Sequence, residues 1–151
     1  MRRDSGILHP VALAALIALV VNDHVGKPCY PGWVTGKLSD AAGLIVFPLL
    51  ACAVARPVVP RVRPARVLAA AIAATMLGFL AIKLWPPATA ACARVLAALQ
   101  HPLAPRAGAV AITRDPTDLL ALPFALVGWW LPRAVDQSPA APPAPPAPPA
   151  P

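Results

Sequence analysis

The chain has 151 residues, of which 58% are hydrophobic and 13% charged, and its formal net charge is +7. A water-soluble domain of this length cannot bury so much apolar surface, so the composition excludes an ordinary soluble protein and makes the lipid bilayer the expected partner. The basic residues stand between apolar runs, as membrane topology requires, so nucleic-acid binding is not expected.

Four apolar runs predict an all-α fold, a polytopic membrane helix bundle with four transmembrane helices in a domain of residues 1–133. The runs cover about 6–22, 38–55, 67–85 and 116–132. A transmembrane helix needs roughly 17 to 25 residues, so these runs are near the short limit. They favour thin or locally distorted lipid around the protein.

The first run opens at His9-Pro10, which is typical of a helix start because proline is tolerated in the first turn. A cleaved signal peptide is the alternative, although Val20-Val21-Asn22-Asp23 contains no small-x-small cleavage site. Residues 25–38 contain glycine and proline breakers and are expected to form a loop, with Tyr30 and Trp33 at the membrane interface.

The second run contains Pro48, which predicts a kink. The following segment, 56–66, holds four arginines and three prolines, and we expect a non-helical cytoplasmic connector there. The third run carries Ala70, Ala74 and Gly78 at four-residue spacing, a small-residue face expected to pack inside the monomer.

Two segments outside the four runs have a distinct character. Residues 88–100 contain Arg94 as their only charge and predict an interfacial helix along the membrane surface. Residues 134–151 form a proline- and alanine-rich tail, expected to be a disordered, extended spacer. Docking of this tail to an SH3-like partner is the alternative.

A hydroxyl residue followed by aspartate opens the second and the fourth run, at Ser39-Asp40 and Thr117-Asp118. Aligning the two pairs suggests a tandem duplication of a helical hairpin, with parallel copies that place both pairs on one membrane face. Ordinary helix capping is the alternative, with Asp115 as the cap before Pro116 and the two pairs facing free backbone amides.

A polar cluster at the outer membrane face is the candidate site. Its members would be Asp23, His24, Lys37, Ser39, Asp40, Lys83, Asp115, Thr117 and Asp118. Because unpaired charges are costly near lipid, we expect Asp40 and Asp118 to share Lys83, with Lys37 as a further partner. The same outer location permits a disulfide between Cys29 and Cys92.

The positive-inside rule places both termini in the cytoplasm and both hydroxyl–aspartate pairs outside. Seven basic residues then lie inside against six outside, and the crowding of the inside ones into a short connector decides the orientation.

Three motifs, NDHVGKP, TGKLSDAAGLIVFPLL and RDPTDLLALP, together resemble a family of small uncharacterised multi-pass membrane proteins found in bacteria. The resemblance covers most of residues 15–131. It implies a four-helix fold in the bacterial inner membrane and carries no activity or ligand.

A non-enzymatic scaffold or accessory subunit, in contact with other membrane proteins, is the favoured function. The chain lacks HExxH, GxSxG and phosphate-binding glycine motifs, and no cofactor is predicted. One alternative is a metal-dependent or acid/base membrane enzyme, in which a divalent metal or a proton is held by Asp40, Asp118, Asp23 and His24. A second is an ion-coupled transporter component, which would need charges deeper in the membrane.

Overall fold

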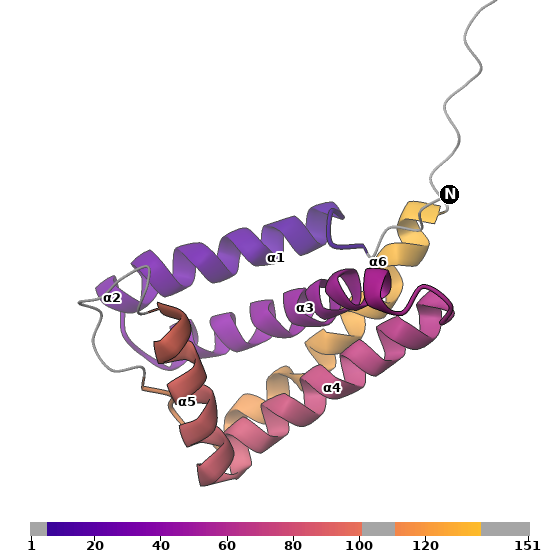
Figure 1. Ribbon diagram of the computed structural model, residues 1–151. Coiled ribbons are helices and arrows are strands. Elements are labelled where there is room, and N and C mark those ends of the chain that lie inside the picture. The colour runs from indigo at the N-terminus through magenta and orange to yellow at the C-terminus, as the bar shows by residue number, and fades with distance from the viewer. Residues whose placement is uncertain (1–5, 101–110, 137–151) are drawn as a thin grey trace, which may run out of the picture.

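The computed structural model describes residues 6–100 and 111–136, and the helices of this part of the chain form an all-α protein without strands (Figure 1). Three helical stretches, Pro10–Cys29, Trp33–Val58 and Pro64–Leu84, are long and apolar enough to cross a membrane. The all-α class is therefore confirmed, together with three candidate crossings. The expected tail lies outside the described residues from 137 onwards.

The first of these candidate crossings starts where the sequence predicts. Helix α1 (Pro10–Val21) is capped by His9, whose Nδ1 accepts a hydrogen bond from the Val11 amide at 3.2 Å. The chain then stays helical through a π-helical turn, η1 (Asn22–Gly26), and a short helix, α2 (Lys27–Cys29). The predicted loop from residue 25 is wrong over this part, since the helix breaks only at residues 30–32.

Helix α3 (Trp33–Val58) begins five residues before the predicted start. The hydroxyl of Thr35 donates to the carbonyls of Tyr30 at 3.1 Å and Gly32 at 3.0 Å, so it satisfies backbone groups at the break and allows the early start. Ser39 and Asp40 consequently lie inside the helix, two turns from its N-terminus. The capping alternative is wrong for these two residues.

The arginine-rich connector is shorter than predicted. Helix α3 continues through Pro48 and Pro57, and helix α4 (Pro64–Leu84) begins with Pro64 in its first turn, which leaves only residues 59–63 outside the helices. Proline is compatible with a first turn because the amide it lacks has no partner within the helix.

The small-residue face of α4 does not pack inside the monomer. Ala70, Ala74 and Gly78 are exposed, whereas the buried face of α4 includes Val67, Leu68, Ala71 and Ile72. Branched side chains offer more van der Waals contact than alanine or glycine, and that contact drives helix packing in lipid. The prediction of internal packing is therefore wrong.

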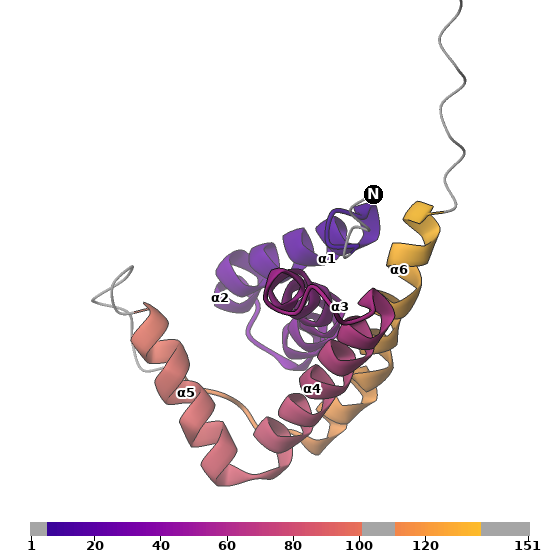
Figure 2. The ribbon, with the colours of Figure 1, turned by 45° about the vertical axis from the view of Figure 1, so that its right-hand side comes forward.

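Helix α5 (Pro86–Gln100) takes the place of the expected interfacial helix at 88–100 and has no buried residue. It leaves the end of α4 at a sharp angle, so the two helices form a V (Figure 2).

The last apolar run is not the single α-helix that the sequence predicts. It forms a 3-10 helix, η2 (Pro116–Leu126), followed by helix α6 (Val127–Asp136), and η2 packs against both α3 and α4. Pro123 lies inside η2 and has no amide hydrogen. In α winding its ring would meet the carbonyl of Leu119, and tighter winding avoids that clash. Residues 134–136, predicted as part of the tail, belong to α6.

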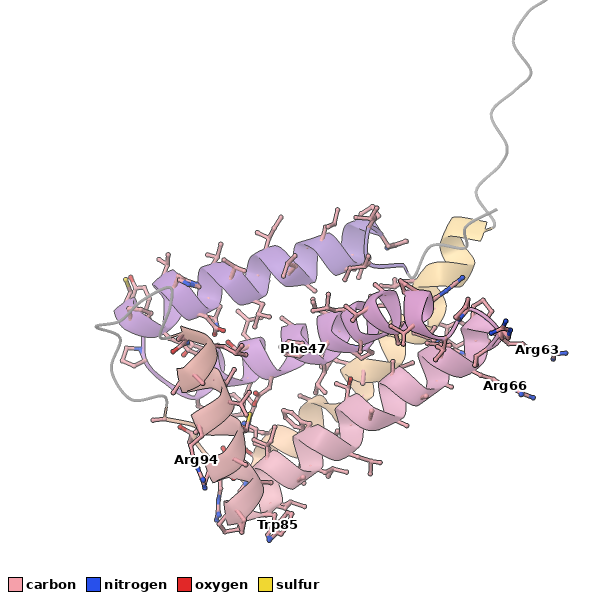
Figure 3. The ribbon with its side chains drawn as sticks, in the orientation of Figure 1. Phe47, Arg63, Arg66, Trp85 and Arg94 are labelled. Atoms are coloured by element: carbon pink, nitrogen blue, oxygen red, sulfur yellow. The ribbon has the colours of Figure 1, made fainter. Side chains whose placement is uncertain are left out.

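The core joins α1, α3, α4 and the last run, with Leu44, Pro48 and Leu49 of α3 fully buried at its centre. Arg63 and Arg66 lie at one end of the bundle, and Trp85 and Arg94 lie at the other (Figure 3). The polar side chains described next gather at the end that carries Trp85.

Candidate functional site

Five charged side chains form a continuous chain of ion pairs, which we name the charge chain: Asp115, Lys37, Asp118, Lys83 and Asp40. The carboxylate of Asp118 lies at its centre. One oxygen accepts a hydrogen bond from Lys37, and the other lies 2.5 Å from Lys83 Nζ. Lys83 also binds Asp40 at 3.0 Å, and Lys37 binds Asp115 at 3.4 Å. The structure thus joins the two aspartates through Lys83, with Lys37 alongside.

Burial is greatest in the middle of the charge chain. The side chains of Lys83 and Asp118 are 8% and 9% exposed, whereas that of Asp115, at one end, is 33% exposed. Buried charges are tolerated when they are paired and hydrogen-bonded. The Thr117 hydroxyl at 2.6 Å from Lys37 Nζ and the Thr113 carbonyl at 3.4 Å from Lys83 Nζ supply further acceptors.

Three elements bring these charges together. Lys37 and Asp40 are three residues apart on α3 and therefore share one face of that helix. Lys83 lies in the last turn of α4, and Asp118 lies in the first turn of η2. Trp33 and Phe79 place their rings 5.4 Å and 5.3 Å from the Lys37 and Lys83 ammonium groups, within the range of cation–π attraction.

Asp115 is the helix cap that the sequence predicts. Its carboxylate accepts a hydrogen bond from the Thr117 amide at 2.8 Å, and Pro116 follows it in the first turn of η2. Hydrogen bonds from the Thr117 amide and hydroxyl, with the nearby Lys37 ammonium, hold the pKa of the Asp115 carboxyl below its usual value. Asp115 therefore stays ionised while it binds both its own helix and α3.

A second polar group, the Asn22 clasp, ties η1 to α3. The side-chain amide of Asn22, a residue that is 5% exposed, donates to the Thr35 carbonyl and to the Ser39 hydroxyl, both at 2.7 Å. Ser39 in turn donates to Asp23 at 2.5 Å, and Asp23 pairs with Lys27 at 2.8 Å. Ser39 thus belongs to the clasp, while its neighbour Asp40 belongs to the charge chain.

Gly26 makes the clasp sterically possible. A Cβ atom at this position would lie 2.6 Å from the Asn22 side-chain oxygen, which is too close for any real contact. Asn22 and Gly26 are absent from the candidates that the sequence provides. The sequence does contain a sign of Asn22, because its polar amide ends an otherwise apolar run. A polar amide near lipid needs a hydrogen-bond partner.

Two predictions from the sequence are not met by this arrangement: His24 belongs to neither the charge chain nor the Asn22 clasp, and the predicted disulfide is not formed. His24 is exposed, and its Nδ1 lies 2.9 Å from the Val20 carbonyl of its own helix. Cys29, Cys52 and Cys92 are all free thiols, so the Cys29–Cys92 disulfide is not formed in this structure. Within residues 6–100 and 111–136, no three histidine, cysteine or acidic side chains are grouped to hold a metal ion.

A groove of about 310 Å³ opens beside the charge chain, between α3 and α4. Asp40, Ser39 and Thr75 line its polar part. The remainder is lined by the apolar side chains of Leu44, Phe47, Phe79 and Ile82, together with Gly43, Ala74 and Gly78. Asp40 is therefore both a member of the charge chain and part of a mainly apolar surface.

Comparisons of the chain with protein-family models, curated proteins and solved structures gave no match.

Proposed function

We propose that the protein is a non-enzymatic membrane scaffold or accessory subunit in which the charge chain holds the last apolar run against α3 and α4. The observation that carries this proposal is the position of Asp118. Its carboxylate comes from η2, and its two oxygens bind Lys37 of α3 and Lys83 of α4. A single side chain thereby joins three segments, as a structural lock would require.

The partners of the candidate catalytic groups favour a scaffold over the enzyme alternative. Asp118 is bound by two ammonium groups, and Asp23 is bound by Lys27 and Ser39. His24 is turned to a carbonyl of its own helix. An acid, a base or a metal ligand is directed at its substrate, whereas Asp118 and Asp23 are directed at side chains of their own chain and His24 Nδ1 at its own helix.

We further propose that Pro116–Leu131 is a fourth crossing, and that both termini face the cytoplasm of a bacterial inner membrane. Support comes from the packing of η2 against α3 and α4, and from the arginines at the opposite end of the bundle from the charge chain. A tandem duplication, with α1–α3 and α4–η2 as its two hairpins, would account for the meeting of Asp40 and Asp118 at one face.

Thiol labelling of intact cells tests the orientation. We expect a membrane-impermeant maleimide to label the exposed Cys29, because it lies at the outer end, and not to label Cys52, which is buried. A cysteine introduced by Val59→Cys should be protected until the cells are permeabilised. Labelling of that position in intact cells, with Cys29 silent, would mean that the protein has the inverted orientation.

Thermal melting with divalent cations separates the scaffold from a metal enzyme. A ligand at one hundred times its Kd stabilises a folded protein by about 2.7 kcal/mol. For a scaffold we expect Mg²⁺, Mn²⁺ and Zn²⁺ to leave the melting temperature of the purified protein unchanged. A stabilisation that disappears in Asp118→Asn would contradict the proposal and assign a metal to this site.

A further inference from the structure

The groove between α3 and α4 is built for close approach by another helix. Ala74 and Gly78 lie on the α4 wall, whereas the ring of Phe47 covers Gly43 on the α3 wall. Ala74 and Gly78 also belong to the exposed small-residue face that begins at Ala70. Small residues allow two helix backbones to come close together in lipid, and this face has no partner within the described part of the monomer.

The electrostatics of the groove select the charge of its occupant. The charge chain contains three carboxylates and two ammonium groups, so its formal charge is −1 when all five are ionised. Asp118 is bound by two lysines, whereas Asp40, at the end that meets the groove, pairs with one lysine, Lys83, among the described residues. A carboxylate in apolar surroundings is stabilised by a cation, so the excess negative charge favours a positively charged occupant.

The groove also fits the stem of a long basic side chain. Phe47 lies near the middle of α3 (Figure 3), and Phe79 lies across the groove on α4. Lysine and arginine bury their methylene stems against apolar surface while the charged head reaches a polar group. The volume of about 310 Å³ is at the small end of the range for ligand sites, which suits one inserted side chain.

We propose that the groove docks a transmembrane helix of a different protein, which inserts a lysine or arginine side chain toward Asp40. This inference rests on the proposed role as an accessory subunit and names the chemistry of its partner. Asp40 is the eighth residue of α3, so the partner's basic residue lies about two helical turns from the outer end of its helix.

A second copy of this chain does not meet that requirement. The three lysines of the chain, Lys27, Lys37 and Lys83, already bind aspartates of their own monomer. The arginines Arg63 and Arg66 are at the opposite end of the bundle, and Arg94 is on α5, which is not one of the helices that could cross a membrane. Among the described residues, no crossing helix of a second copy therefore offers an uncommitted lysine or arginine two turns from its outer end.

A synthetic probe tests the proposal directly. The probe is a transmembrane peptide of leucine and alanine with one lysine two turns from its outer end, and its control carries methionine at that position. Energy transfer from the labelled peptide to protein labelled at Cys29 measures binding in phosphatidylcholine vesicles. We expect the lysine peptide to bind roughly tenfold more tightly than the methionine peptide.

Two pairs of variants locate the binding surface. Gly78→Leu should weaken binding of both peptides, because an added side chain enters open space in the groove without meeting a neighbour. Ala73→Leu is its control, since Ala73 is exposed on the same helix but does not line the groove. Asp40→Asn should abolish the preference for lysine, while Asp23→Asn, which removes a carboxylate from the Asn22 clasp, should preserve it.

Several outcomes would overturn the proposal. The first is equal affinity of the protein for the lysine and methionine peptides. The second is a preference for the lysine peptide that survives Asp40→Asn. The third is peptide binding that is lost when the vesicles are made of phosphatidylethanolamine in place of phosphatidylcholine. Self-association that Gly78→Leu abolishes, without peptide binding, would assign the groove to a second copy instead. If the peptide does not bind, the proposed docking site is wrong but the proposed scaffold function still stands. The scaffold function is tested separately, by melting the protein with divalent metal ions.

Discussion

Asp118→Asn is expected to lower the free energy of unfolding by about 3 to 5 kcal/mol. The Asp118 side chain is 9% exposed and binds both lysines of the charge chain, so the neutral amide would break two ion pairs at once and leave Lys83 only Asp40 and Lys37 only the more distant Asp115 within the charge chain. Equilibrium unfolding in mixed detergent micelles measures the loss. The large effect comes from the charges left behind, since asparagine has nearly the same shape as aspartate.

Asp23→Asn is the matched control for this variant. Asp23 is also an aspartate paired with a lysine, but its side chain is 39% exposed and that of Lys27 is 44% exposed. Exposed pairs contribute about 0 to 1 kcal/mol, so the control should be nearly silent. Equal, small losses of unfolding free energy in Asp118→Asn and Asp23→Asn would contradict the lock. They would show that Asp118 stabilises only the first turn of η2, a role in which asparagine replaces aspartate well.

Lys83→Met should lower the free energy of unfolding by a similar amount, because it removes an ammonium group from two carboxylates. The change leaves Asp40 without its lysine and Asp118 with Lys37 alone, and we expect a loss of about 3 to 5 kcal/mol. The corresponding change at the exposed pair, Lys27→Met, should cost about 1 kcal/mol or less. Both variants can be measured in the same micelles as Asp118→Asn.

Combining Lys83→Met with Asp118→Asn tests whether the two residues belong to one unit. Once Asp118 is neutral, Lys83 has lost its shorter ion pair, so its removal should cost less than in the native protein. Coupled neighbours deviate from additivity by about 0.5 to 3 kcal/mol. Strict additivity of the two losses would show that Asp118 and Lys83 are stabilised independently and that no shared lock exists.

The sequence predicted those parts of the structure that depend on local chemistry. His9-Pro10 and Asp115-Pro116 each combine a side-chain acceptor with a proline, and both begin helical segments. The sharing of Lys83 by Asp40 and Asp118 was predictable for a different reason. Few charges stand near the ends of the apolar runs, and each of them needs a partner near lipid.

Other parts required contacts between distant residues. Helix α3 has no side-chain cap at Gly32, and Thr35 stabilises its beginning by bonding backward to carbonyls at the break. Ser39 and Asp40 therefore resembled a helix start although they lie two turns inside. The Asn22 clasp likewise joins residues 13 and 17 positions apart, a separation that no local pattern reveals.

The inward face of α4 was unpredictable for a reason specific to membranes. In a soluble protein the polar face of a helix shows which side is outside, because water solvates it. Both sides of α4 are apolar, as in a helix that could cross a membrane, so Ala70, Ala74 and Gly78 gave no indication of whether they face the monomer or its surroundings. Only the packing of Val67, Leu68 and Ile72 decides it.

The winding of η2 changes the fit of the last apolar run to the bilayer. A 3-10 helix rises about 2.0 Å per residue and an α-helix about 1.5 Å, so the 11 residues of η2 extend about 22 Å instead of about 17 Å. With the five α-helical residues that follow, Pro116–Leu131 reaches about 30 Å, the thickness of the hydrocarbon layer. Wound entirely as an α-helix, the same run would reach about 24 Å and leave a hydrophobic mismatch of about 6 Å. In the proposed fourth crossing the winding around Pro123 absorbs this mismatch, and the surrounding lipid does not have to thin.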